Sequence, residues 1–108
     1  MTDKIVVLTT CASPEEARRI ARHLVEKRVA ACVNIMDAAT SVYHWQGAIE
    51  ETAESVLMIK SSRPLFDRLR AELRRVHTYQ VPEVVAIGII DGAPDYLEWM
   101  ERELAPAE

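Results

Sequence analysis

The segment around His77 holds the side chains of this sequence that are best suited to chemistry. His77 lies two residues before Tyr79 and six residues before Glu83. An imidazole and a carboxylate are ligands for divalent metal ions, and the same pair can act as general acid and base. The alternative is structural, with His77 and Glu83 holding a loop through hydrogen bonds at a subunit boundary. Metal sites usually take three or four ligands and no close cluster of donors is present, so both interpretations stay open.

Two cysteines are further candidate metal donors. Cys32 lies between apolar neighbours, where a free cysteine is most often a small buried side chain, although its thiolate would suit Cu(I). Cys11 ends the first apolar run, which predicts an exposed thiol. Two cysteines are too few for a disulfide scaffold.

Several other polar side chains have a more ordinary interpretation. Glu50, Glu51 and Glu54 follow one another on a strand-like segment, where we expect a solvated sheet edge that discourages aggregation. The alternative is that Glu54 pairs with a base across a subunit boundary or helps to hold a cation. We expect His44 at solvent or an interface, and His23 in solvent beside a helix.

Composition and missing motifs exclude several classes of protein. Thirteen Lys and Arg against seventeen Asp and Glu give a net charge of −4, and an acidic chain without a basic run does not favour nucleic-acid binding. No apolar run reaches the ~18 residues of a membrane span, and no signal peptide is recognisable. Motifs of hydrolases and zinc peptidases and glycine-rich phosphate loops are absent. We therefore predict a cytoplasmic protein that is not an enzyme and needs no organic cofactor.

The elements that must position these side chains follow from hydrophobic periodicity. Apolar runs predict strands over 5–10, 29–45, 48–61 and 82–90, and apolar stripes predict helices over 14–28, 62–76 and 94–104. Ser13, Pro14 and Glu16 form the start signal of the first helix, including a capping box. The order predicts a single α+β domain over residues 1–108: a ferredoxin-like βαββαβ sandwich with an extended hairpin and a C-terminal helix.

The predicted hairpin is too long for its own domain. The first strand spans ~23 Å and the strand over 48–60 spans ~43 Å, at ~3.3 Å per residue. The tip should therefore extend ~20 Å beyond the core, exposing Val42, Tyr43, Trp45 and Ile49. A two-stranded ribbon is only marginally stable alone in water, so we expect a partner subunit to receive it in a closed assembly. The alternative is a hairpin that curls back over its own sheet.

Three motifs in order resemble the CutA family of divalent-cation tolerance proteins: residues 30–35 (AACVNI), 43–50 (YHWQGAIE) and 77–83 (HTYQVPE). The later YLEW at 96–99 also fits, so the resemblance covers about residues 4–104. It implies a homotrimer with interlocking hairpins, similar in architecture to the PII signalling proteins. We expect a kink or bulge over residues 36–39. The chain departs from the family at this bend, where it has Asp37-Ala38 and Pro-Gly is usual. It also departs at Thr78, where proline is common, and at Thr9, where some members carry a copper-linked cysteine.

Two functions follow as expectations from this resemblance. The first is a role in tolerance of divalent metal ions such as copper, with weak or indirect metal binding through His77, Glu83 and Cys32. The second is a PII-like module that binds a small effector in a cleft between subunits, where Lys60, Tyr79 and His77 would line the pocket.

Overall fold

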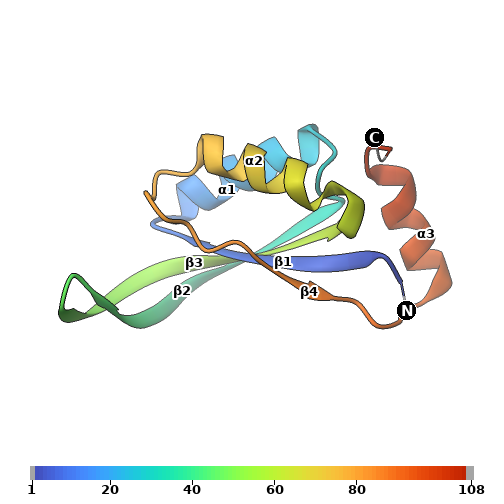
Figure 1. The fold of residues 1–108 in the computed structure, drawn as a ribbon. Coiled ribbons are helices and arrows are strands. Elements are labelled where there is room, and N and C mark those ends of the chain that lie inside the picture. Colours follow the sequence, from blue (N-terminus) through green and yellow to red (C-terminus); the bar gives the residue numbers. More distant parts are fainter. Residues whose placement is uncertain (1, 107–108) are drawn as a thin grey trace.

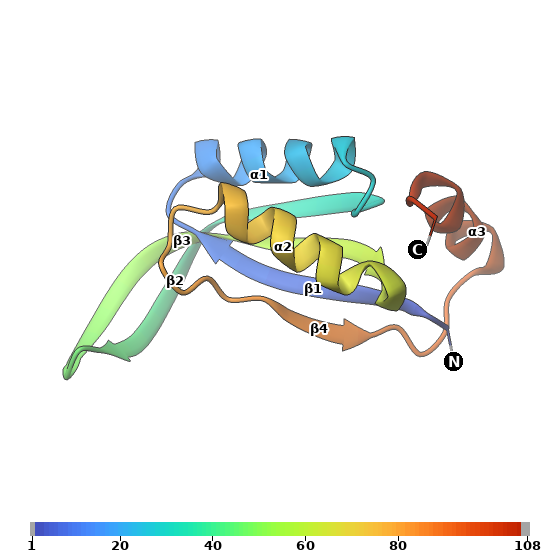
Figure 2. The same ribbon diagram turned by 45° about the horizontal axis from the view of Figure 1, so that its top comes forward.

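The protein is described by a computed structural model, which covers residues 2–106. Four antiparallel strands form one sheet in the order β2-β3-β1-β4. Two helices cover one face of this sheet, and a third packs at its end (Figures 1 and 2). The strands are β1 (Lys4–Cys11), β2 (Cys32–Trp45), β3 (Ala48–Ser62) and β4 (Val85–Gly88), and the helices are α1 (Pro14–Glu26), α2 (Phe66–Val76) and α3 (Pro94–Glu103).

The helix boundaries follow local sequence signals. Ser13 caps α1 by accepting a hydrogen bond from the Glu16 N–H at 3.1 Å, and Pro14 occupies the first turn. The Glu16 carboxylate does not complete the capping box, because it accepts from the Ala12 N–H at 3.1 Å. A 3-10 turn over Arg63–Leu65 leads into α2. The start signals were therefore predicted correctly, but the second half of the capping box was wrong.

The core lies between the sheet and the two covering helices. Alternate side chains of β1 and β3 point toward the helices, and the stripes of α1 and α2 pack onto them, as the periods of two and 3.6 require. The fully or nearly fully buried members include Ile5, Val7, Ile20, Leu24, Leu57, Ile59, Leu69 and Leu73. A smaller cluster of Leu65, Met100 and Leu104 holds α3 against the end of the sheet.

The opposite face of the sheet carries no helix (Figure 2). Its side chains are also apolar: Ile87 is 55% exposed and Val85 49% exposed on β4, and Met36 is 45% exposed on β2. In register beside them lie Val6 and Leu8 of β1. Exposed apolar side chains that gather on one face are typical of a surface that another chain covers.

The hairpin extends beyond the rest of the molecule, as predicted. β1 pairs with β3 only over residues 55–62, so residues 48–54 run on with β2 alone. Seven further residues at ~3.4 Å each correspond to ~24 Å, and the molecule measures 45 × 25 × 22 Å. Figure 1 shows the ribbon leaving the sheet instead of folding back over it.

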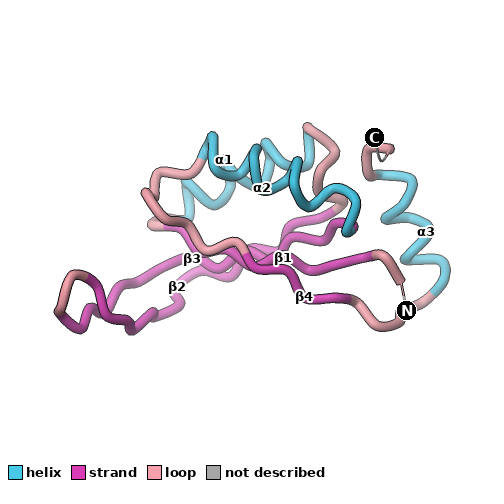
Figure 3. Tube along the Cα trace, viewed as in Figure 1, coloured by secondary structure: helices cyan, strands magenta, loops and turns pink. Residues whose placement is uncertain are grey.

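Two strand predictions were too long. Residues 29–31 do not belong to β2, because Arg28 has φ 58° and the Val29 N–H still bonds to the Leu24 carbonyl. β4 covers 85–88 only, and the segment that leads into it is a loop (Figure 3). Pro82 lacks an N–H for a ladder, and β1 offers partners only for residues 85–88.

The bend in β2 persists at Asp37-Ala38. The register against β3 shifts between Met36 and Ala39, which marks a β-bulge. Ala38 takes φ 64°, a left-handed conformation that costs an L-residue ~1–2 kcal/mol. The Asp37 carboxylate secures the bulge by accepting a hydrogen bond from the Ser55 hydroxyl at 2.8 Å.

Substituting Ala38→Gly is expected to raise the thermal unfolding temperature. Glycine removes the left-handed strain, and this gain exceeds the ~0.5–1 kcal/mol of extra unfolded-chain entropy that glycine brings. Ala53→Gly in the regular part of β3 is the matched control and should lower the unfolding temperature. Equal destabilisation of both variants in a thermal melt would show that Ala38 is not strained.

Candidate functional site

The predicted site residues near His77 lie where the hairpin leaves the sheet. The loop after α2 passes over the end of β1 and the start of α1 (Figure 1). It brings His77, Thr78 and Tyr79 against Thr10, Glu16 and Glu54. Four elements therefore meet here, and hydrogen bonds between side chains and backbone hold them together.

His77 is locked by its two ring nitrogens. Its side chain is fully buried, and Nε2 lies 2.7 Å from the Thr10 carbonyl oxygen, which can only accept. Nδ1 accepts the Tyr79 backbone N–H at 3.0 Å. These two bonds assign Nε2 as the donor and Nδ1 as the acceptor of the ring. A metal ion at this imidazole would have to displace one of them.

Glu16 is the buried carboxylate of the site. One oxygen accepts both the N–H and the hydroxyl of Thr78, at 3.0 and 2.7 Å, and the other accepts the Ala12 N–H. Burial alone would raise its pKa, but these hydrogen bonds outweigh burial and hold the pKa of Glu16 below its usual value. The ionised carboxylate thus ties α1 to the loop.

Tyr79 and Glu54 form a second link, between the loop and β3. The Tyr79 hydroxyl donates to Glu54 Oε2 at 2.6 Å. Burial and this hydrogen bond raise the pKa of Tyr79 above its usual value, so the phenol stays protonated at neutral pH. Glu54 is only 7% exposed, so the predicted solvated edge was wrong for Glu54. It was correct for Glu50 and Glu51, which are exposed.

Cys11 is buried, and the prediction of an exposed thiol was wrong. It is 0% exposed because β1 continues to Cys11 and points this side chain into the core. Burial, assisted by the nearby Glu16 carboxylate, raises the pKa of Cys11 to about 11. The thiolate that metals prefer is therefore disfavoured. His23, which we expected in solvent, is partly buried: its side chain is 24% exposed, and its Nε2 lies 2.7 Å from Glu72 Oε1, which links α1 to α2.

The remaining predicted residues do not join this cluster. Cys32 and Lys60 face each other in register toward the other end of the sheet, five residues or ~17 Å along β3 from Ser55. Lys60 Nζ contacts the Tyr96 hydroxyl at 3.4 Å and lies 5.6 Å from its ring centre. Glu83 is exposed. Over residues 2–106, no three histidine, cysteine or acidic side chains converge as a metal site requires.

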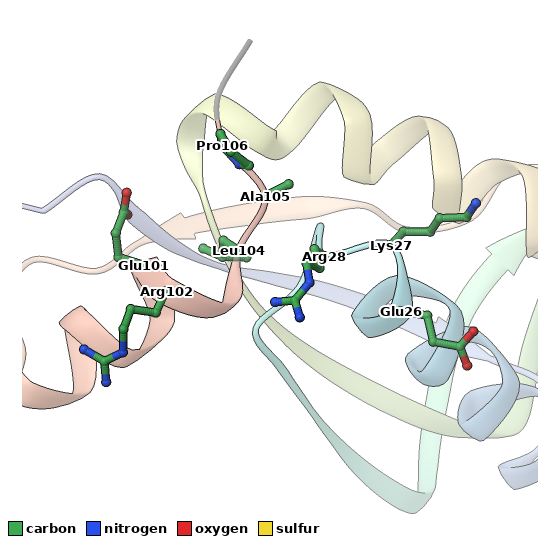
Figure 4. A pocket seen from close by; sticks show the side chains of 8 residues that line it. All are labelled: Glu26, Lys27, Arg28, Glu101, Arg102, Leu104, Ala105 and Pro106. Atoms are coloured by element: carbon green, nitrogen blue, oxygen red, sulfur yellow. The ribbon is translucent and has the colours of Figure 1, made fainter.

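Two hollows lie near these ends of the molecule. An apolar notch of about 180 Å³ between hairpin and loop is lined by Tyr43, Trp45, Tyr79, Gln80 and Val81. An open hollow of about 700 Å³ lies between the C-terminal ends of α1 and α3, among Arg28, Arg102, Leu104 and their neighbours (Figure 4). Only the first contains a predicted site residue, Tyr79.

Sequence reasoning missed the part played by Glu16. Its spacing from Ser13 predicted a helix cap, and no local signal reveals that the loop 62 residues later supplies two of its hydrogen bonds. The pairing of Tyr79 with Glu54 was missed for the same reason. Only the packing of the loop over the sheet brings these residues together.

The fold defines the class: an α+β, ferredoxin-like fold whose hairpin extends beyond its sheet and whose loop after α2 is held by hydrogen bonds at the base of the hairpin. The family described as CutA1 divalent ion tolerance protein matches residues 5–103. The chain belongs to this family.

Known members support this assignment. A divalent-cation tolerance protein CutA from Thermus thermophilus is 46% identical over 97 residues, covering 90% of this chain and 94% of that protein. Human protein CutA is 44% identical over 93 residues, but this chain spans only about half (52%) of its length. The crystal structure of CutA from Xylella fastidiosa superposes with a TM-score of 0.94 at 36% identity, covering 96% of this chain and 100% of that one.

The names of other relatives point to different compartments. An Arabidopsis thaliana relative is called chloroplastic, and a solved structure from Archaeoglobus fulgidus is described as periplasmic. No helix within residues 2–106 has the length and apolarity needed to cross a membrane. The cytoplasmic location therefore stays a prediction.

Glu16→Gln is expected to destabilise the protein by ~1–3 kcal/mol at pH 7, because an amide cannot accept all three hydrogen bonds. The pKa of Glu16 is lower in the folded than in the unfolded chain. Its contribution is therefore complete above the unfolded pKa of ~4.3 and is lost as pH falls through the folded pKa. The variant should lose less stability than wild type between about pH 5 and pH 3.

Thermal melts at pH 7, 5, 4 and 3 measure this difference. The matched control is Glu15→Gln, one residue earlier on the exposed side of α1, which should follow the wild-type curve. A parallel pH dependence for wild type and Glu16→Gln would contradict the assigned role.

Proposed function

We propose that this chain is a non-enzymatic homotrimer that acts in tolerance of divalent metal ions, with copper the expected ion and metal binding weak or indirect. Family membership supports the link to metal tolerance, and the names of the family and of its members carry no catalytic activity. The trimer comes from the resemblance to the CutA family. We further propose that residues 1–108 act as one domain in the cytoplasm.

The observation that carries the assembly is the uncovered apolar surface. The sheet face without helices carries Val85 and Ile87, 49% and 55% exposed, and the hairpin carries Ile49, Val42 and Trp45, 68%, 62% and 48% exposed. At ~25 cal/mol per Å² of buried apolar area, covering such surfaces is the main driving force for association. A closed assembly would cover them without leaving an open end.

Light scattering on the purified protein tests the assembly. We expect a mass of about three times 12.2 kDa for the wild type. Ile87→Glu places a charge on the uncovered face and should dissociate it into monomers, because an unpaired buried charge is strongly unfavourable. Ala71→Glu on the exposed side of α2 should leave the mass unchanged. Circular dichroism establishes that each variant is folded, and a folded wild-type monomer would overturn the trimer.

The placement of the predicted ligands supports weak rather than chelated metal binding. Within one chain, Cys32 lies ~17 Å along the strand from the end of the sheet where His77 is held. His77 has both nitrogens engaged, and Glu83 is exposed. His77, Glu83 and Cys32 of one chain would therefore bind a metal ion as separate donors and not as one chelate.

Calorimetric titration of the intact protein with Cu²⁺ tests these donors. Each of His77→Gln, Glu83→Gln and Cys32→Ser should weaken binding by less than about tenfold, because residues 2–106 of one chain form no chelate of three or four ligands. His44→Gln and Glu51→Gln, which alter exposed side chains of the same types, are the controls. A tight isotherm for the wild type that one substitution abolishes would contradict weak binding. Unchanged isotherms for all three variants would show that His77, Glu83 and Cys32 are not ligands.

The alternative function is a PII-like module that binds a small effector. The apolar notch at Tyr79 supports a pocket there. Lys60 lies toward the other end of the sheet in the same chain, so a pocket that uses both residues would need two subunits.

A further inference from the structure

The charges of this acidic protein are segregated in space. Residues 14–28 and 63–76, which form α1, α2 and their flanks, carry ten of the thirteen Lys and Arg but only five of the seventeen Asp and Glu. Both helices lie side by side as the outer layer of the molecule (Figures 1 and 2). A chain with net charge −4 therefore presents a layer with five excess positive charges.

Two neighbouring arginines of α1, Arg18 and Arg22, are among the arginines of this layer that have no side-chain partner within residues 2–106. Arg18 and Arg22 are both exposed, and neither makes a hydrogen bond or ion pair with any residue in 2–106. At i and i+4 of α1 they lie on one face, with Cβ atoms ~5–6 Å apart, where like charges destabilise a helix. Arg19 differs, since it donates to the Val76 carbonyl at 2.9 Å and lies 3.6 Å from Glu16.

A groove with an apolar floor runs beside these two arginines. It has a volume of about 370 Å³ and lies between α1 and the edge strand β2. Val33 and Ile35 of β2 and Val25 of α1, which is 42% exposed, supply the apolar surface. Glu26 lies at the C-terminal end of the same side of α1. The groove is on the helix side of the sheet, opposite the uncovered face that we propose for assembly.

We propose that this groove binds an acidic, amphipathic segment of another protein. Two of its carboxylates would pair with the Arg18 and Arg22 guanidinium groups, whose planar forks match carboxylates. An apolar side chain between them would cover Val25 and Ile35. The apolar floor favours an amphipathic peptide over a nucleic-acid backbone, since a phosphate chain gains nothing from apolar surface.

Fluorescence anisotropy at 150 mM salt tests this proposal with two labelled ten-residue peptides, one alternating Glu and Leu and one alternating Glu and Ser. We expect the Glu/Leu peptide to bind at least about tenfold more tightly, because only it covers the floor. Arg18→Gln/Arg22→Gln should weaken its binding at least about tenfold. The control is Arg70→Gln/Arg74→Gln, the same charge change at the same spacing on α2, and should stay within about twofold of wild type.

Four outcomes would overturn the proposal. The first is that the Glu/Leu peptide fails to bind. The second is that the two double variants weaken peptide binding equally, because an equal loss would indicate nonspecific charge attraction. The third is that a labelled 20-base-pair DNA duplex binds more tightly than the peptide, because the layer would then be a phosphate-binding surface. The fourth is that Arg18→Gln/Arg22→Gln changes the mass measured by light scattering, because the groove would then be an interface between copies of this chain.

Discussion

The register of β3 against β1 is the constraint on which the rest of the structure depends. β1 has eight residues and β3 has fifteen, and their ladder ends at the pair of Cys11 with Ser55. Within residues 2–106, every residue of β3 before that pair leaves the sheet with β2 as its sole strand partner. A shift of the ladder by one residue would turn Leu57 and Ile59 out of the core. The hydrophobic pattern of β3 thus fixes where the hairpin emerges and how far it extends.

The locked loop lies at that point of emergence, and its hydrogen bonds explain why. Where β1 ends, its last carbonyl and amide groups lose their ladder partners, and buried backbone groups need others. The His77 ring donates a hydrogen bond to the Thr10 carbonyl, and the Glu16 carboxylate accepts one from the Ala12 N–H. Tyr79 then holds Glu54 just beyond the end of the ladder. As residue types, a histidine and two carboxylates suggest catalysis or metal binding. In this structure, their hydrogen bonds hold four elements together.

The two sides of the molecule differ in what they present to their surroundings. One side of the sheet is apolar and uncovered, which suits association of like subunits through the hydrophobic effect. The other side is covered by α1 and α2, whose outer surface is rich in arginine. In an assembly built on the uncovered face, the helices would remain on the outside. The proposed self-association and the proposed binding of an acidic segment would therefore use separate surfaces of one small chain.

The sequence by itself determined the order of elements, the ferredoxin-like class and the overhanging hairpin, because each depends on local periodicity and on strand length. It also contained the bend at Asp37-Ala38. What it did not determine was which polar residues meet. Glu16 and Thr78 are 62 residues apart, and Tyr79 and Glu54 are 25 apart, and no short-range pattern encodes such pairs. Burial of Cys11, the separation of Cys32 from His77 and the gathering of arginines on one layer were likewise decided by tertiary packing, because that alone sets distances between residues remote in the chain.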